Sequence, residues 1–325
     1  MKVTGIALVS GGLDSVLAVK VLQEQNIDII GVAFETPFFD ARRARLAAEE
    51  IGIPLMVLNI TDDHMVMLRA PRYGYGKNLN PCIDCHMMML AKAGEKMKEL
   101  GADFISTGEV LGQRPMSQNK QSLHIVASRS GYGDYVIRPL SAKLLPETIP
   151  EKEGKVDRER LLDIQGRSRK PQLEMAKRYG IEAYSSPAGG CLLTDPGFSR
   201  RLKDLLDHAG DVKLRDIELL KFGRHLRLNA DTKILIGRKE RENKAIENLS
   251  GPDDCLVKVR DFPGPTVLIP GGCDEETLMR AASFCAVYSD APKDSDVVAT
   301  CRNGNTTRFI TVRAAEKAEI TPLMI

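Results

Sequence analysis

Two groups of side chains in this sequence have the types and spacing to do chemistry. They are the string Ser10-Gly11-Gly12-Leu13-Asp14-Ser15 and the three cysteines Cys82, Cys85 and Cys191. Paired glycines let backbone amides close around an anion, and the carboxylate of Asp14 is a hard ligand that suits Mg²⁺. The string therefore predicts a phosphate-binding turn, and the alternative is an ordinary tight turn capped by Ser10 or Asp14.

The cysteines favour metal or thiol chemistry. Cys82 and Cys85 follow Pro81, a residue that is favoured in the first turn of a helix. Their i, i+3 spacing puts both sulfur atoms on one side of that helix, where the macrodipole is expected to lower their pKa values. Two buried structural cysteines are the alternative. The remaining cysteines lack ligand spacing and are expected to pack in a core: Cys255, Cys273, Cys285 and Cys301.

The elements around the turn alternate between strands and helices. Short apolar runs predict buried strands over 3–9, 28–34, 54–60 and 103–107, and the apolar spacing between them predicts helices over 14–25, 41–51 and 87–100. This alternation is typical of βαβ units and a parallel sheet, in which ligands bind at the carboxyl ends of the strands. A last strand over 135–140 and helices over 157–165 and 171–179 complete this part of the chain, with Asp40 as the expected N-cap of the second helix.

The composition changes after residue 197. Short strand-like runs separated by Gly, Pro and Asp follow, with helices expected over 200–209, 213–220 and 275–287. The fold class is therefore α/β: a parallel-sheet, doubly wound domain over 1–185, a linker over 186–197 that carries Cys191, and a smaller α+β domain over 198–325.

Length and composition set the outer bounds. The 325 residues allow two domains, and the formal net charge of +2 does not by itself indicate a nucleic-acid-binding protein. The sequence has no signal-peptide pattern and no apolar run long enough for a membrane span, so we expect a cytoplasmic protein without a membrane partner. Seven cysteines without a signal peptide argue against a disulfide framework. The oligomeric state stays open.

The string Ser10 to Ser15 matches, residue for residue, the SGGxDS loop of the N-type, or PP-loop, ATP pyrophosphatases. The resemblance implies an adenine nucleotide alpha hydrolase-like fold, ATP and Mg²⁺ as cofactors, and a substrate activated as an adenylate. The nucleotide-binding residues that the resemblance implies lie in the loop and at the ends of the second and fourth strands: Ser10, Gly11, Gly12, Leu13, Asp14, Ser15, Ala33, Phe34, Thr107, Gly108, Glu109 and Gln113. Adenine is expected at the end of the second strand, where Phe34 either stacks on the base or is plain core.

Two further strings resemble the sulfur-inserting branch of this family. Asn80-Pro81-Cys82 before a long helix is similar to the tRNA 2-thiouridine synthases, and the run from Thr107 to Gln113 is similar to the tRNA 4-thiouridine synthases. The resemblance implies an ATP-dependent tRNA sulfurtransferase that adenylates a uridine carbonyl, with 4-thiouridine favoured over 2-thiouridine. The catalytic residues would be Asp14, Cys82 and Cys191. The sulfur donor would be sulfide, a cysteine desulfurase or a sulfur carrier.

The cysteine set resembles that of the three-cysteine thiolases of the family, in which three cysteines hold a 4Fe-4S cluster with an open iron. By that resemblance Cys82, Cys85 and Cys191 are the metal ligands. One alternative is zinc with His86 as the fourth ligand. The other needs no metal: Cys191 would carry a persulfide and be released by forming a disulfide with Cys82 or Cys85.

The strings 222–228 and 233–243 resemble the RNA-associated NFACT-R module. The partner implied by the resemblance to the tRNA thiouridine synthases is tRNA. No THUMP or rhodanese segment is recognisable. The rival functions are a PP-loop ligase that adenylates a small molecule, and a non-catalytic RNA-binding or sulfur-carrier module. The expected RNA contacts, each with solvated surface charge as the alternative, are Arg114, Arg167, Arg169, Lys170, Arg224 and Arg238.

Overall fold

The chain folds into two compact units, Met1–Thr194 and Asp195–Ile325. The computed structural model describes residues 2–181 and 190–325. Most of the first half of the expected 186–197 linker therefore lies outside the described residues, and the domain bounds drawn from the sequence stay a prediction. Each unit is described by itself below.

The first unit is built on a five-stranded parallel sheet with the strand order β3-β2-β1-β4-β5. Leu8, at the end of β1, is in register with Val32 of β2 and Thr107 of β4, so the chain leaves these three strands at the same edge. The expected α/β fold with a parallel sheet is confirmed. The strands are β1 (Thr4–Leu8), β2 (Asp28–Glu35), β3 (Leu55–Asn59), β4 (Phe104–Thr107) and β5 (Val136–Ile137).

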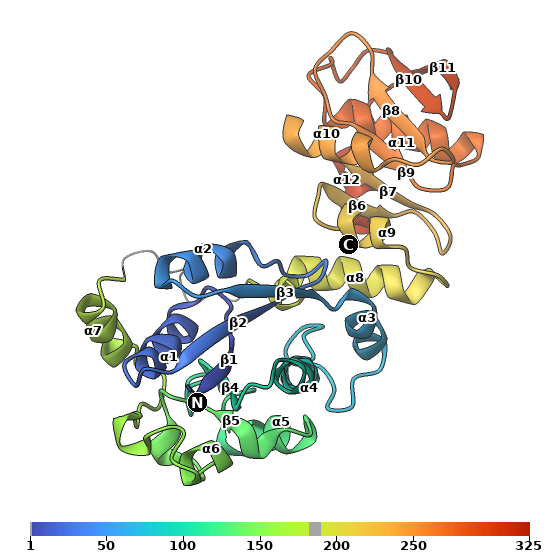
Figure 1. Cartoon of the computed structure of the whole chain (residues 1–325). Coiled ribbons are helices and arrows are strands. Elements are labelled where there is room, and N and C mark those ends of the chain that lie inside the picture. Colours follow the sequence, from blue (N-terminus) through green and yellow to red (C-terminus); the bar gives the residue numbers. More distant parts are fainter. Residues whose placement is uncertain (1, 182–189) are drawn as a thin grey trace. The chain divides into compact units, whose positions relative to one another are not determined.

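Helices cover both faces of this sheet (Figure 1). On one face α1, α2 and α7 bury a core of small and branched side chains, and on the other α4 and α5 bury a second core, with α3 beside α4. Burial on both faces explains why the strands read as continuous apolar runs. The helices are α1 (Leu13–Gln23), α2 (Arg42–Ile51), α3 (Thr61–Arg69), α4 (Cys82–Leu100), α5 (Lys120–Arg129), the short α6 (Ile149–Lys152) and α7 (Lys170–Arg178).

Some local predictions for this unit were wrong. The segment 157–165 is not a helix beyond the 3-10 turn Arg158–Arg160, because the amides of Leu162 and Ile164 donate to the carbonyls of Pro139 and Leu140 instead. The strand expected over 135–140 is also shorter in the structure. Only β5 is a strand, because the chain turns at Arg138 to Ser141. The N-cap of α2 is Ala41, although the Asp40 carboxylate still accepts from the Arg42 amide at 2.9 Å. Helices α3 and α5 were not predicted.

The second unit contains a six-stranded sheet in the order β11-β10-β8-β9-β7-β6, whose neighbours all pair antiparallel. Helix α11 packs on one face, and α9 and α10 pack on the other. Helix α10 and strands β10 and β11 were not predicted. The elements are α8 (Pro196–His208), α9 (Leu214–Leu219), β6 (Arg224–Arg227), β7 (Lys233–Ile236), α10 (Glu240–Leu249), β8 (Cys255–Val259), β9 (Val267–Ile269), α11 (Glu275–Val287), β10 (Val297–Asn303), β11 (Thr306–Val312) and the short α12 (Lys317–Ile320).

Three of the four cysteines expected to pack in this unit, Cys255, Cys285 and Cys301, are buried, whereas Cys273 is exposed. Packing therefore accounts for three of them and not for the fourth. Among the described residues, no helix is both long and apolar enough to cross a membrane.

Candidate active site

A cavity of about 1110 Å³ opens at the edge of the parallel sheet where β1, β2 and β4 end. Its volume is at the upper end of the range for ligand sites. The expected chemical groups meet there, because the loop after β1, the start of α4 and Cys191 all line it. The predicted site residues on its wall are Ser10, Gly12, Leu13, Asp14, Ser15, Ala33, Phe34, Cys82, Cys85, Thr107, Gly108, Glu109, Gln113, Arg114, Arg167, Arg169 and Cys191.

The loop between β1 and α1 is held by its own side chains. The Ser15 hydroxyl donates to the Gly12 carbonyl at 2.8 Å, and the Gly12 amide donates to the Ser10 hydroxyl at 3.3 Å. Gly11 has a φ of +74°, and a Cβ there would lie 2.4 Å from the backbone of Arg43. Only glycine fits this turn, and the helix N-terminus that follows adds its partial positive charge. The local geometry is that of a phosphate cradle.

Gly108, directly after β4, presses against the same loop. A Cβ on Gly108 would lie 2.5 Å from the Ser15 amide nitrogen. The close backbone approach of Gly108 to Ser15 joins the end of the fourth strand to the cradle, as expected from their places in the sheet.

Asp14 faces the cavity from the first turn of α1. One carboxylate oxygen, Oδ2, accepts from the Gln113 side chain at 2.8 Å. The other, Oδ1, is buried and has no hydrogen-bond partner among the described residues. A buried carboxylate oxygen without a partner costs free energy unless a ligand satisfies it. Asp14 therefore fits a cation or a donor group that binds in the cavity, and Mg²⁺ is the cation that the chemistry of phosphates calls for.

Glu109 is the centre of a buried polar cluster beside the cavity. Its carboxylate accepts from Arg138 at 2.9 Å and from Thr107 at 3.2 Å, and it lies 3.0 Å from Nδ1 of His86. Burial alone would raise the pKa of Glu109, but the charge of Arg138 and the His86 hydrogen bond outweigh it and lower the pKa to about 2. An ionised carboxylate only accepts, so Nδ1 of His86 donates to it and Nε2 is the nitrogen left for other partners.

Replacing Glu109 with Gln is expected to destabilise the first unit by about 3 to 5 kcal/mol at pH 7, because Arg138 is left as a buried charge without its partner. The pKa of Glu109 is depressed on folding, so its contribution is present above its unfolded pKa and is lost as the pH falls from about 4.5 towards about 2. Urea unfolding should show a large difference between parent and variant at pH 7 and a smaller one at pH 3. Equal differences at the two pH values would contradict this assignment, and Glu99→Gln, on the exposed face of α4, is the matched control.

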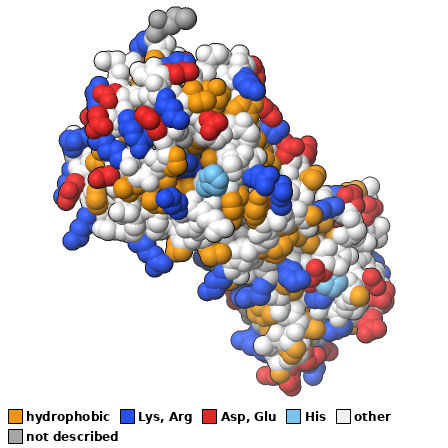
Figure 2. Space-filling view, turned by 90° about the horizontal axis from the view of Figure 1, so that it is seen from below, with side chains coloured by type: hydrophobic (Ala, Val, Ile, Leu, Met, Phe, Trp, Pro, Cys, Tyr) orange, Lys and Arg blue, Asp and Glu red, His pale blue; other side chains and the backbone are white. Residues whose placement is uncertain are grey.

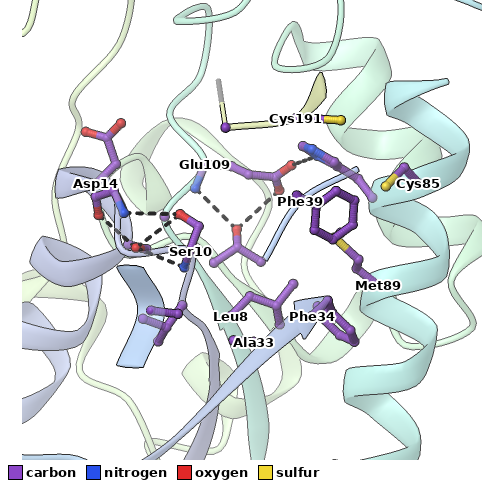
Figure 3. Close-up of a pocket in the computed structure, with 18 of the residues that line it drawn as sticks. Leu8, Ser10, Asp14, Ala33, Phe34, Phe39, Cys85, Met89, Glu109 and Cys191 are labelled. Atoms are coloured by element: carbon purple, nitrogen blue, oxygen red, sulfur yellow. Dashed lines mark hydrogen bonds and ion pairs between the residues drawn. The ribbon is translucent and has the colours of Figure 1, made fainter. Parts of the chain in front are cut away.

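The three cysteines lie at the end of the cavity away from the loop. Figure 3 shows Asp14 and Ser10 on one side, Cys85 and Cys191 on the other, and Leu8, Ala33 and Phe34 between them. All three thiols are free, and they are close enough to influence one another electrostatically. The cavity therefore presents a phosphate cradle and a thiol cluster to the same ligand.

The expected lowering of the pKa values of Cys82 and Cys85 by the helix macrodipole is wrong for Cys85. Burial raises the pKa of Cys191 to about 11, and burial with the neighbouring Cys191 and Cys82 raises that of Cys85 further. Desolvation of the thiolate outweighs the macrodipole because the thiols are partly buried together. Within 2–181 and 190–325, no group of three or more His, Cys, Asp or Glu side chains is arranged to hold a metal ion.

Ala33 and Phe34 end β2 beside the cradle, where a nucleotide base was expected. Phe34 lines the cavity but is only 8% exposed and belongs to the core under α4. Phe34 is therefore mainly a core residue, and its contact with a nucleotide base stays a prediction.

The basic residues expected at RNA have different surroundings. Arg114, Arg167 and Arg169 line the cavity, whereas Lys170 is exposed outside it. In the second unit, Arg224 lies over the Tyr288 ring at 4.4 Å, and Arg238 is paired with Glu242 at 2.7 Å. Figure 2 shows Lys and Arg interspersed with Asp and Glu rather than gathered in one patch. RNA binding by these residues stays a prediction.

Sequence reasoning missed several residues of the site. Arg138 and Gln172 have no local signal, because their partners lie 29 and 59 residues away in the chain. His64 also lines the cavity: it lies 5.3 Å from the Phe38 ring, and burial lowers its pKa to about 4. His86 was expected only as the fourth ligand of the zinc alternative, and its bond to Glu109 required the fold.

Two protein families match this chain. Residues 1–151 match the family described as tRNA methyl transferase HUP domain, and residues 223–324 match the family described as NFACT protein RNA binding domain. The expected resemblance to PP-loop enzymes of tRNA thiolation, followed by an NFACT-R-like region, is confirmed.

Curated relatives match the first part of the chain. A tRNA-specific 2-thiouridylase MnmA from Clostridium acetobutylicum is 36% identical over 118 residues, which are 30% of this chain and 33% of that protein. The MnmA of Symbiobacterium thermophilum is 26% identical over 60% of this chain and 54% of its own length. The chain thus spans about a third to a half of these relatives. A solved 4-thiouridine synthetase–RNA complex with bound ATP is 20% identical, with a TM-score of 0.40, over 66% of this chain and 52% of its own.

Proposed function

We propose that this chain, whose residues 1–151 match the tRNA methyl transferase HUP domain family and whose residues 223–324 match the NFACT protein RNA binding domain family, is an ATP-dependent tRNA sulfurtransferase. The observation that carries the proposal is the shared cavity: a phosphate cradle at one end and three free cysteines at the other. A protein that only binds a nucleotide would use the first end of the cavity. An enzyme that uses only thiol chemistry would use the second end. Activation by ATP followed by sulfur transfer uses both.

The cradle would bind the phosphates of ATP. The amides of the loop and the N-terminus of α1 face them, and Arg114, Arg167 and Arg169 line the same cavity. Mg²⁺ bound at Asp14 would neutralise the charge that develops on the leaving pyrophosphate. The uridine carbonyl oxygen attacks the α-phosphate, pyrophosphate leaves, and the product is an adenylated base.

The thiol end would deliver the sulfur. A sulfur nucleophile attacks the activated carbon, the carbon–oxygen bond breaks, and AMP carries away the original carbonyl oxygen. The raised pKa values of Cys85 and Cys191 keep these thiols protonated at neutral pH, so the attacking sulfur has to be either activated by a bound group or brought as a persulfide. His86, held by Glu109 beside Cys85, is placed to contact the acceptor from this side.

The finer part of the proposal is an iron–sulfur cluster on Cys82, Cys85 and Cys191. Three thiolates with one open position suit such a cluster better than a closed zinc site, and the bound cluster would supply an iron that carries sulfide. The three thiols would have to converge around it, because the described residues do not form a metal-holding group. Anaerobic reconstitution decides the point: full thiolation by iron-free protein would exclude the cluster and leave the persulfide route on Cys191.

The test of the function is the fate of ATP with and without tRNA. We expect the full chain with Mg²⁺ and a sulfur source to release AMP from ATP when unmodified tRNA is added, and mass spectrometry of the digested tRNA to show a thiolated uridine. The nucleoside itself decides between 4-thiouridine, which the Thr107 to Gln113 string favours, and 2-thiouridine, the product named for the curated relatives. AMP release stimulated by small acids instead would indicate a ligase, and tRNA binding without AMP would indicate a non-catalytic module.

A further inference from the structure

Gln172 is a polar side chain that is completely buried, although it lies on a surface helix. It belongs to α7, its exposed fraction is 0%, and its neighbours Pro171 and Leu173 are exposed. Its amide nitrogen donates to Oε1 of Gln113 at 3.3 Å, while its own oxygen has no hydrogen-bond partner among the described residues. Burying an amide that is only half satisfied costs free energy, so a packing role does not explain the residue.

The direction of the two hydrogen bonds that link Gln172, Gln113 and Asp14 follows from the Asp14 carboxylate. The ionised carboxylate of Asp14 only accepts hydrogen bonds, so Gln113 must present its NH₂ group to Oδ2, at 2.8 Å. The Gln113 oxygen then faces away from Asp14, and Gln172 must present an NH₂ group to it. If Gln113 turned over, its oxygen would face the carboxylate and repel it. Gln172 thus holds Gln113 in the orientation that supports Asp14.

The backbone brings the two glutamines together from distant segments. The Gly166 amide donates to the Leu111 carbonyl at 2.7 Å, and Leu111 pairs with Gln165 in an isolated parallel bridge. Gly112, with a φ of +76°, approaches Gly166 so closely that a Cβ there would lie 3.4 Å from its amide nitrogen. This contact fixes the start of α7 against the segment that carries Gln113.

We propose that Gln172 is a positioning residue that, through Gln113, orients the carboxylate of Asp14 for the metal ion of the bound nucleotide. The inference rests on the proposed function, because the metal and the nucleotide are those of the adenylation step. Removing a residue that hydrogen-bonds to a metal ligand commonly changes the metal affinity by 10- to 100-fold.

The experiment measures metal binding without turnover. Mn²⁺ is titrated into the full chain, saturated with the α,β-methylene analogue of ATP, and free Mn²⁺ is read by electron paramagnetic resonance. Gln172→Leu, which keeps the volume and removes the amide, is expected to weaken Mn²⁺ binding about 10-fold. Gln172→Glu is expected to weaken it more, because the new carboxylate accepts from the Gln113 NH₂ group and turns the Gln113 oxygen towards Asp14. Glu174→Gln, exposed on the same helix, is the control and should bind Mn²⁺ like the parent.

Melting temperatures of all variants separate positioning from packing. A Gln172→Leu protein that melts earlier but binds Mn²⁺ as tightly as the parent below its melting temperature would overturn the proposal. Equal Mn²⁺ affinity of the parent, Gln172→Leu and Gln172→Glu would also overturn the proposal. If the parent binds Mn²⁺ with the analogue but releases no AMP with tRNA, the proposed function is wrong, while the role of Gln172 in metal binding still stands.

Discussion

Asp14→Asn is expected to lower tRNA-stimulated release of AMP by at least about 10²-fold to 10³-fold, the range found when a group that stabilises transition-state charge is removed. The substitution keeps the size of the side chain and its contact with Gln113, but it removes the negative charge of a carboxylate that lines the cavity. Charge on the pyrophosphate is then neutralised less well. AMP is measured by chromatography of labelled ATP products.

The control for this variant is Asp163→Asn, an exposed carboxylate of the same unit. Asp14 is half-buried and makes no ion pair in the described residues, so the melting temperature of Asp14→Asn should stay close to that of the parent. Unchanged AMP release by a folded Asp14→Asn protein would show that the loop takes no part in the reaction. It would also contradict the adenylation step.

Cys191→Ser is expected to abolish formation of the thiolated nucleoside while ATP binding changes by less than about twofold. Cys191 lies at the far end of the cavity from Ser10 and Asp14, so the substitution removes a sulfur atom without touching the cradle (Figure 3). The change from thiol to hydroxyl is small in volume, and the Leu192 amide, which anchors this segment to the Phe38 carbonyl at 2.9 Å, is unaffected. Thiolated uridine is measured by mass spectrometry of digested tRNA.

Cys273→Ser is the matched control, because Cys273 is the exposed cysteine of the second unit and lies outside the cavity. It should thiolate tRNA like the parent. Normal thiolation by Cys191→Ser would show that the sulfur does not pass through this residue. Loss of ATP binding in the same variant would show instead that Cys191 supports the cradle.

The local pattern predicted the elements best where packing and propensity agree. The strands β1, β2 and β4 were recognisable because they are largely buried, the edge strand β3 was recognisable from its apolar run, and helix α11 was predicted with its observed bounds. The helix expected over 157–165 failed because its amides pair with the backbone of Pro139 and Leu140, a contact that no local pattern can indicate. Strand β11 is the outer strand of its sheet, is mostly exposed and has mixed polarity, so the sequence pattern of the β10–β11 pair was weak.

By itself the sequence determined the turn, since Gly11 directly after a buried strand can adopt the φ of +74° that the loop needs, and the Ser10 hydroxyl accepts from the Gly12 amide. It also predicted that Cys82, Cys85 and Cys191 act together, and all three line the cavity. Only the tertiary structure decided how these groups are tuned. Burial raises the pKa of Cys85 against the helix dipole, and burial also raises that of Cys191, because desolvation depends on everything packed around the thiols. The supports of Glu109 and Asp14, namely Arg138 and Gln172, come from far along the chain, because hydrogen bonds are formed by neighbours in space.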